Sequence, residues 1–545
     1  MKFLLDGREI EAKPGQTILG VARDVGVDIP ALCFLEKCGP ATSCLVCLVK
    51  LNVNGQSKLV PACATPVREG MVVESETPDV HEARRTALEL LLSDHVGDCL
   101  SPCHRICPLH LNIPKMLRQV ESGDLIGAIA TARDAVAFPS IVGRLCHHPC
   151  ENGCRRGTWD SPAAIRDLER HVGDADLASD TPFLPECNPA SGKSVAIVGA
   201  GPTGLMAAYR LLRRGHACTV LVRGAVPGGT LLSSVTGADL PRDILESETG
   251  LIERMGGVFQ LNRSVIDADV LTSLTRQYDA VLLAMGPCSR SAGEQLGLEM
   301  TSAGIKIDAA RGLTSVDRVF AAGSAVKPVK QLVRAMREGQ GVADCMDTWL
   351  SGTEVRRRDK SFSSVMGRLD QEEVGQFMKW ASEAPRTEPS CGAGCGFSPK
   401  EAGLEASRCM HCDCRAVDNC KLRYYAEQYD ADPAHFRSQR RRFEQQHRPG
   451  QVIFESGKCI LCGICLKIAE QAREPLGLTF VGRGFDVQVG VSFGNSFAAG
   501  LQKTAAECVH HCPSGALTLN DLARDCREEV SSPPQSLLDS VTQPV

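Results

Sequence analysis

The alternation of hydrophobic and polar positions predicts several kinds of element along the chain. Near the start, KFLLDG and EIEAKPG alternate as strands do, and residues 17–26 have the spacing of a short helix. Residues 81–95, HEARRTALELLLSDH, form an amphipathic helical pattern. Residues 278–286 and 318–325 are apolar runs typical of buried strands. The mixture predicts several domains and a multidomain α/β and α+β fold.

Length and composition suggest where these domains begin and end. With 545 residues, the chain is long enough for three to five domains. Residues 179–194 are rich in Pro and Ser, and residues 352–364 are polar and basic, as linkers are. We expect domains at 1–78, 79–180 and 193–352, a linker with a Cys-rich motif at 353–450, a further domain at 451–522 and a disordered tail at 523–545.

Charge and hydropathy argue against some classes of function. The chain has 60 basic and 65 acidic residues, so we expect no nucleic-acid partner. No apolar run reaches about 18 residues, so we expect no transmembrane segment. Asp6, Arg8 and Glu9 stand where a signal peptide would need an apolar core, which predicts a cytoplasmic protein.

The 27 cysteines are the dominant feature of the composition. In a reducing compartment, cysteines in C-x-x-C groups bind metal more often than they form disulfides. The isolated cysteines between residues 155 and 390 are interpreted as ordinary core or loop thiols. The others form four groups, at 33–63, 99–154, 391–420 and 459–512.

The first group has the spacing Cys33-x10-Cys44-x2-Cys47-x15-Cys63. Four thiolates suit a [2Fe–2S] cluster, although the plant ferredoxin spacing is different. With SCLVCLVKL and PACATPVREGM, the pattern resembles the N-terminal [2Fe–2S] domain of the large iron–sulfur subunit of complex I and of NADH-linked hydrogenases. The resemblance implies a β-grasp domain. Zinc is the alternative metal.

The second group is too large for one metal site and suits two [4Fe–4S] clusters. Its candidate ligands are His95, Cys99, Cys103, Cys107, Cys146, Cys150 and Cys154. The segment resembles the N-terminal helical domain of the glutamate synthase small subunit and of dihydropyrimidine dehydrogenase.

That resemblance implies how the ligands are shared. It assigns Cys99, Cys103 and Cys154 to one cluster, and Cys107, Cys146 and Cys150 to the other. Glu169, in AAIRDLERH, occupies the acidic ligand position of the second cluster. His95 stands where the family has a cysteine. Two interpretations of His95 are open: it is a cluster ligand, or it is a histidine at the end of a helix with no ligand role.

The third group places four thiolates in one loop: Cys409, Cys412, Cys414 and Cys420. The loop resembles a compact cluster motif of the complex I large subunit, with a cysteine where that family has histidine. A structural zinc site is the alternative, since four cysteines in a short loop suit it too. Cys391 and Cys395, just before the loop, receive no assignment.

The fourth group contains the bacterial ferredoxin run C-x2-C-x2-C, formed by Cys459, Cys462 and Cys465. The fourth position of the run is Ala469. Because the cysteine of a Cys-Pro pair completes the other cluster in two-cluster ferredoxins, we expect Cys512 to close this one. One [4Fe–4S] cluster in a ferredoxin-like domain is predicted, and Cys508 has no role in it.

A glycine-rich loop lies between a strand pattern and a helix pattern at 193–216. Its G-x-G-x-x-G glycines, which bring a pyrophosphate to the helix N-terminus, are Gly199, Gly201 and Gly204. With VPGGTLL, which contains Gly228 and Gly229, and VFAAGSA, which contains Gly323, the segment resembles the Rossmann-like FAD domain of the glutamate synthase small subunit.

Two positions depart from this family. The acidic ribose-binding residue is replaced by Val222, followed by Arg223, and the closing Asp is replaced by Ser324. FAD remains the expected cofactor. A retained fold with an empty site and NADP held by Arg223 are the alternatives.

Only 32 residues separate Gly286 from Val319, where this family inserts its NAD(P)H-binding domain. Such a domain needs on the order of a hundred residues. We therefore expect electrons to enter through iron–sulfur clusters. The expected cofactors are one [2Fe–2S] cluster, three or four [4Fe–4S] clusters and FAD.

The predicted function is an electron-transfer subunit between an NADH-oxidising flavoprotein partner and a catalytic subunit of the hydrogenase or formate dehydrogenase type. An NAD(P)H-dependent oxidoreductase like the glutamate synthase small subunit and a non-redox zinc scaffold are the alternatives.

Overall fold

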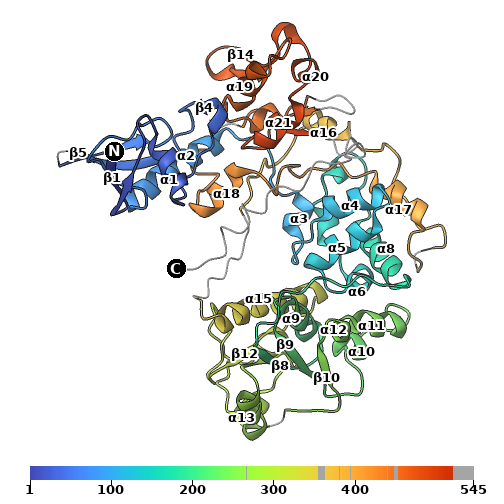
Figure 1. Ribbon diagram of the computed structural model, residues 1–545. Helices are drawn as coiled ribbons and strands as arrows, with labels where there is room; N and C mark the ends of the chain where they lie inside the picture. The colour runs from blue at the N-terminus through green and yellow to red at the C-terminus, as the bar shows by residue number, and fades with distance from the viewer. Residues whose placement is uncertain are drawn as a thin grey trace. The chain divides into compact units, whose positions relative to one another are not determined.

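The computed structural model divides the chain into two compact units (Figure 1). Unit 1 comprises Met1–Cys99, Phe362–Gln376 and Asp413–Val545, and unit 2 comprises Leu100–Ser361 and Phe377–Cys412. The residues that the structure describes are 1–53, 55–265, 267–353, 362–379, 381–392, 394–437, 440–446 and 452–519. The expected tail at 523–545 and most of the linker at 352–364 lie outside them.

Unit 1 begins with a five-stranded sheet in the order β2-β1-β7-β5-β6. Its strands are β1 (Lys2–Leu5), β2 (Arg8–Glu11), β5 (Leu48–Val53), β6 (Gln56–Pro61) and β7 (Val72–Glu74). Strand β1 pairs antiparallel with β2 and parallel with β7. Helix α1 (Ile18–Asp24) begins at Thr17, whose side chain accepts a hydrogen bond from Gly20 N. The two strands and the helix predicted at the start of the chain are confirmed.

The amphipathic helix predicted at 81–95 is α2 (Pro78–Ser93), and its buried face carries an arginine. Arg84 donates to the Leu48 carbonyl at 3.0 Å and to the Tyr429 hydroxyl at 2.7 Å. These bonds tie α2 to strand β5 and to the end of helix α18 (Lys421–Gln428). The helix ends two residues before His95, so its C-terminal end positions that side chain.

The C-terminal part of unit 1 folds around two antiparallel strand pairs. These are β13 (Val452–Phe454) with β16 (Leu517–Leu519), and β14 (Thr479–Val481) with β15 (Gln488–Gly490). Helices α19 (Ile464–Gln471) and α21 (Ala505–His511) pack together beside them. This arrangement brings the loop before α19 close to the loop after α21.

Unit 2 begins with a group of helices. They are α3 (Pro102–Ile106), α4 (Ile113–Glu121), α5 (Leu125–Ala135), α6 (Pro139–Leu145), α7 (Pro149–Asn152), α8 (Ile165–Leu177) and, later in the chain, α17 (Pro399–Ala406). Helices α6 and α8 approach closely at two glycines. A methyl group on Gly143 would lie 2.5 Å from the backbone N of Arg170, and one on Gly173 would lie 2.4 Å from that of Ser140.

The rest of unit 2 is built on a parallel sheet in the order β10-β9-β8-β11-β12. Its strands are β8 (Ser194–Val198), β9 (Ala217–Leu221), β10 (Val258–Gln260), β11 (Ala280–Leu283) and β12 (Val319–Ala321). Helices α9 (Pro202–Arg213) and α15 (Leu332–Leu350) pack against each other. The order is that of a dinucleotide-binding fold, in which ligands bind beyond the carboxyl ends of the strands.

The two buried strands predicted at 278–286 and 318–325 are confirmed as β11 and β12. Residues 284–318, all of which the structure describes, contain the short helix α14 (Arg290–Gln295) and no strand of any sheet. The connection between β11 and β12 therefore carries no second sheet-based domain.

Within the described residues, no single helix is both long enough and apolar enough to cross a membrane, although α5 and α6 meet that criterion when taken together as a bent pair.

Candidate cofactor sites

The first set of candidate ligands lies beside the N-terminal sheet, around the edges of strands β5 and β6. It consists of Cys33, Cys44, Cys47 and Cys63, all buried. The Cys33 thiol is hydrogen-bonded to Cys44 and Cys63, and Cys47 is hydrogen-bonded to Cys63. The bond from Cys63 lowers the pKa of Cys47 to about 7, against the opposing effect of burial. The same hydrogen bonds raise the pKa of Cys44 and of Cys63. The mutual contact of four buried thiols is therefore the feature that suits a cluster.

The second set lines one cavity in the C-terminal part of unit 1. It consists of Cys459, Cys462, Cys465 and Cys512. Leu461 and Gly463 have positive φ angles of 53° and 72°, which turn the backbone between the cysteines. Burial raises the pKa of Cys459 and of Cys462 to about 12. Cys508 lies next to this set, with its Sγ 3.7 Å from the Cys465 carbonyl oxygen.

The third set lies among the helices of unit 2. Cys107 follows α3, Cys146 follows α6, Cys150 is in α7 and Glu169 is on α8. Burial raises the pKa of Glu169 to about 8, with a further contribution from Glu248. Its Oε1 is buried and has no hydrogen-bond partner among the described residues. A buried oxygen in that state is costly unless something binds it, and a cluster iron would.

A fourth set combines early and late segments of unit 2. Burial raises the pKa of Cys103, and the neighbouring thiols that add to this effect are Cys154, Cys409 and Cys412. Cys409 also raises the pKa of Cys154. The two segments are held together by Arg156, whose Nη1 donates to the carbonyl oxygen of Arg408 at 3.0 Å. Both arginines are buried.

The fifth set lies in unit 1 and also joins distant segments. One small cavity is lined by His95, Cys99, Cys414 and Cys420. Burial, together with the neighbouring Lys458 ammonium, lowers the pKa of His95 to about 4. The imidazole is therefore neutral at physiological pH, which is the form that binds metal.

The fourth and fifth sets differ from the grouping suggested by sequence spacing. The resemblance to the glutamate synthase small subunit assigned Cys99 to the same cluster as Cys103, and the spacing of the loop 409–420 assigned its four cysteines to a single cluster. In the structure, Cys409 and Cys412 lie near Cys103, whereas the rest of the loop lies near Cys99. The same twenty candidate ligands are present, but two of the clusters exchange members.

This division also bears on the zinc alternative. A tetrahedral zinc site gathers four ligands around one ion at about 2.0–2.3 Å. Among the described residues, no three Cys, His, Asp or Glu side chains have the geometry of a single-ion site. In a four-iron cluster each ligand binds a different iron, so the ligands stand further apart. The division of the loop between two sets does not match one four-cysteine zinc site at 409–420.

Cys391 and Cys395 lie at the surface of unit 2, outside the five sets. The Cys395 Sγ is 3.3 Å from the Cys391 carbonyl oxygen, and Arg170 donates to the Cys395 carbonyl at 3.2 Å. Arg170 is one residue from Glu169 on α8, so the bond fixes this loop against the helix that carries the acidic ligand.

The glycine loop between β8 and α9 is shaped for a pyrophosphate. Gly199 has a φ of 110°, and a methyl group there would lie 2.5 Å from the Ala284 carbonyl oxygen. A methyl group on Gly204 would lie 1.9 Å from the Gly199 carbonyl oxygen, so this glycine allows the helix to meet the strand. Around Gly201 there is open space within 4 Å. The three positions thus perform the turn, packing and ligand-approach roles of a dinucleotide-binding loop.

Two further glycine segments meet this loop. Gly228 N donates to the Ala200 carbonyl oxygen at 2.9 Å, and a methyl group on Gly229 would lie 2.7 Å from Gly201 Cα. Gly323, with a φ of 67°, lies against the Thr203 side chain. The glycine segments therefore converge at the N-terminus of α9, where a phosphate would bind.

The two positions that depart from the flavin pattern, Val222 and Ser324, have different surroundings. Val222 is buried and its N donates to the Gln260 carbonyl at 2.9 Å, whereas Arg223 is exposed. Ser324 exchanges hydrogen bonds with the backbone of Val329, at 3.2 and 3.4 Å. The residues present fit the pyrophosphate of FAD, but they offer no acidic side chain for its ribose.

A comparison with protein-family models finds three matches in succession. Residues 1–78 match a 2Fe-2S iron-sulfur cluster binding domain, residues 81–181 match dihydropyrimidine dehydrogenase domain II, 4Fe-4S cluster, and residues 168–339 match pyridine nucleotide-disulphide oxidoreductase. The chain is therefore a multidomain α/β protein that carries a [2Fe–2S] domain, a [4Fe–4S] domain and a flavin-type oxidoreductase domain. The resemblances drawn from the motifs of the first two cysteine groups and of the glycine-rich loop are confirmed.

Three proteins that are similar to this chain are named as subunits of dehydrogenases or oxidoreductases. The NADP(+)-dependent formate dehydrogenase subunit beta of Moorella thermoacetica is 37% identical over 231 residues, or 38% of this chain and 33% of the relative. The NADPH-Fe(3+) oxidoreductase subunit beta of Geobacter sulfurreducens is 34% identical over 34% of this chain and 28% of the relative. The NAD-dependent dihydropyrimidine dehydrogenase subunit PreT of Escherichia coli is 32% identical over 37% of this chain and 50% of the relative. The chain spans half or less of the length of each.

Proposed function

We propose that this chain is an electron-transfer subunit. It relays electrons between an NADH-oxidising or NAD-reducing flavoprotein partner and a catalytic subunit of the hydrogenase or formate dehydrogenase type. The observation that carries the proposal is the presence of five separate sets of buried or partly buried cysteine, histidine and glutamate side chains in one chain. Relatives that are subunits of formate dehydrogenase and of other oxidoreductases support it.

The sets correspond to one [2Fe–2S] and four [4Fe–4S] clusters. We assign the [2Fe–2S] cluster to a β-grasp domain at 1–78 and two [4Fe–4S] clusters to the helical domain at 79–180 with its late-chain ligands. A third [4Fe–4S] cluster is assigned to His95 and Cys99 with the Cys-rich motif at 353–450, and a fourth to a ferredoxin-like domain at 451–522. When bound, the clusters carry single electrons, and FAD in the domain at 193–352 exchanges pairs. The protein's own residues supply soft ligands, exclude water from the cavities and set the local charge.

The connection between β11 and β12 supports electron entry through clusters. It contains one six-residue helix where a nicotinamide-binding domain would need on the order of a hundred residues. A hydride donor therefore has no domain of the usual kind in this unit. FAD held by the glycine loop at Gly199, Gly201 and Gly204 would supply two-electron chemistry, and the clusters would supply one-electron chemistry.

A second candidate function is an NAD(P)H-dependent oxidoreductase. The names of the Geobacter and Escherichia relatives favour it, since both include a nicotinamide nucleotide. Reduction of a dye by the isolated chain with NADPH or NADH would support this candidate. A chain that accepts electrons only from a reduced ferredoxin-like protein or dithionite would support the electron-transfer subunit.

The deciding measurement is the content of iron, acid-labile sulfide and flavin per chain in anaerobically purified protein. The full assignment predicts about 18 iron and one FAD. The same iron without FAD would make the central domain a structural scaffold within an electron-transfer subunit. A colourless protein with zinc and no labile sulfide would overturn the proposal.

A further inference from the structure

We propose that His95, Cys99, Cys414 and Cys420 bind one [4Fe–4S] cluster with one histidine and three cysteine ligands, and that the histidine ligand raises the reduction potential of this cluster. The inference rests on the proposed function and deepens it. It identifies a ligand set that sequence spacing divides between two sites.

The four side chains share one small, mostly apolar cavity in unit 1. Its walls include Leu92, Phe362, Val417 and Leu422. The backbone N–H of Cys414 donates to the Cys99 carbonyl oxygen at 3.2 Å, which fixes the two ligand segments against each other. Cys420 is held by its Sγ, which lies 3.6 Å from the Pro513 carbonyl oxygen. The cavity is therefore closed by four segments of the chain.

His95 has the features of a ligand and lacks those of a structural histidine. It lies in the cavity wall, and its buried Nδ1 has no hydrogen-bond partner among the described residues. A buried ring nitrogen without a partner is costly, so a bound iron would relieve that cost. The backbone around it is fixed, since Val96 N donates to the Gly457 carbonyl at 2.7 Å.

The other cysteines of the loop 409–420 are engaged elsewhere. Cys409 and Cys412 lie near Cys103 and Cys154 in unit 2. A single cluster on this loop would have to draw its four thiols away from two different surroundings. With the loop divided, every set has four candidate ligands.

The surroundings of the cavity favour the reduced cluster, which carries one more negative charge. Ser364 N and Arg423 N each donate to a ligand sulfur, of Cys99 and Cys420 respectively, at 3.4 Å. The buried ammonium of Lys458 lies near Cys414, and Glu455 is its ion-pair partner. A neutral histidine in place of an anionic thiolate acts in the same direction. Hydrogen bonds, positive charge and a histidine ligand all raise a cluster's potential.

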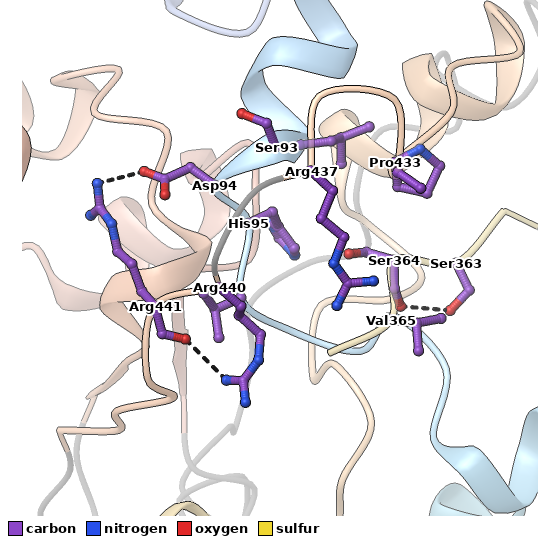
Figure 2. Close-up of a pocket in the computed structure, with 13 residues that line it drawn as sticks. Ser93, Asp94, His95, Ser363, Ser364, Val365, Pro433, Arg437, Arg440 and Arg441 are labelled. Atoms are coloured by element: carbon purple, nitrogen blue, oxygen red, sulfur yellow. Dashed lines mark hydrogen bonds and ion pairs between the residues drawn. The ribbon is translucent and has the colours of Figure 1, made fainter. Parts of the chain in front are cut away.

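The imidazole also borders a second, more polar pocket of about 150 Å³. Figure 2 shows His95 in this pocket with the side chains of Arg437 and Arg440 near it. Arg440 forms an ion pair with Glu373, and Arg441 forms one with Asp94 at 2.5 Å. His95 and Leu92 line both pockets, and His95 is the one member of the proposed ligand set that lines the more polar one.

The ligand set is tested by pairs of alanine variants examined by EPR after reduction. Cys99→Ala and Cys414→Ala should lose the same four-iron signal, and Cys103→Ala and Cys412→Ala should lose a different one. Cys395→Ala, outside every set, should lose none. If Cys412→Ala and Cys414→Ala lose the same signal, or Cys99→Ala and Cys103→Ala do, the proposed set is wrong.

His95 is tested by substitutions that keep the fold. His95→Cys should retain all the iron and lower the potential of this one cluster, and His95→Ala should lose about four iron per chain. Protein labelled with ¹⁵N-histidine should show nitrogen coupling to this cluster, which His95→Cys abolishes. His81→Gln, at the exposed start of α2, is the matched control. Coupling that persists in His95→Cys, or an unchanged potential, would reject the histidine ligand alone. Absence of labile sulfide in the wild type would reject the proposed function instead.

Discussion

The backbone N–H of Cys414 is hydrogen-bonded to the carbonyl oxygen of Cys99 across 3.2 Å, although 314 residues separate them in the chain. The bond joins the segment that follows helix α2 to a loop near residue 414. It shows that the cysteine loop at 409–420, which has the spacing of one compact motif, is divided between two surroundings. The ligand sets follow the contacts of the folded chain and not the spacing of the cysteines.

The buried Lys458 should tune the cluster at His95 and Cys99. In Lys458→Met, loss of the ammonium should lower that cluster's midpoint potential. A unit charge at about 8 Å contributes roughly 2 kcal/mol at an effective dielectric constant near 20, or on the order of 90 mV for one electron. Redox titration followed by EPR measures the shift.

The control for this prediction concerns Glu455, which loses its ion-pair partner in Lys458→Met. Glu455 would remain buried, held by Gln445 Nε2 at 3.0 Å. The double variant Lys458→Met/Glu455→Gln removes both charges and should recover much of the wild-type potential. Equal potentials in the wild type and in Lys458→Met would show that the ammonium does not act on this cluster.

Glu169 should be required for one cluster of unit 2. Because its Oε1 is buried without a partner beside Cys107, Cys146 and Cys150, we expect Glu169→Ala to lose about four iron per chain. Glu169→Gln keeps an oxygen ligand and should retain the iron with an altered EPR signal. Asp167→Asn, on the same helix, should behave as the wild type. Full iron in Glu169→Ala would exclude a ligand role.

Two glycines of the dinucleotide loop should respond differently to alanine. In Gly204→Ala, the methyl group would meet the Gly199 carbonyl oxygen at 1.9 Å, so the domain should lose more than about 3 kcal/mol of stability. In Gly201→Ala, the methyl group has open space, so the fold should persist while flavin binding weakens. Thermal unfolding and flavin content measure the two effects. Unchanged flavin content in Gly201→Ala would place the cofactor elsewhere or show that none is bound.

Glu248 should make the stability of unit 2 depend on pH. Burial raises its pKa from 4.5 to about 7, although Arg133 Nη2 lies 3.5 Å from its carboxylate. Since the folded state favours the protonated acid, this contribution is complete below about pH 4.5 and is lost as the pH rises through 7. Glu248→Gln can still accept the 2.7 Å bond from Ser140 N and cannot ionise.

The variant should therefore be more stable than the wild type at alkaline pH, by on the order of 1–3 kcal/mol, with a smaller difference near pH 6. Denaturant titration at about pH 6 and about pH 8.5 provides the comparison. Glu246→Gln, exposed on the same helix, should leave the pH dependence unchanged. Parallel pH profiles for the wild type and Glu248→Gln would contradict the prediction.

The sequence predicts the helices and strands of this protein better than it predicts the contacts between them. The strands at 278–286 and 318–325, the helix before His95 and the glycine loop at Gly199 all follow from local patterns, because period and turn chemistry are local properties. Which loops come together is decided by packing between distant segments. Spacing alone therefore joined Cys414 to Cys412.

The charges around the candidate clusters were missed for the same reason. Lys458 precedes a ferredoxin-type run, where its position suggests an exposed side chain. The structure buries it beside Glu455 and close to Cys414. A lysine directly before a cysteine motif, with an acidic residue three positions earlier, is the sequence signal that could have identified it.

The bond between Cys99 and Cys414 can form only late in the synthesis of the chain. At translation rates of about 5–20 residues per second, Cys414 is made roughly 16–60 seconds after Cys99. All four thiols of the set at 33–63 exist while most of the chain is still unmade. The set that begins at His95 has to wait with an uncovered imidazole and thiol. A supply of iron and sulfide that fails late in synthesis would therefore leave molecules with the first cluster and without this one.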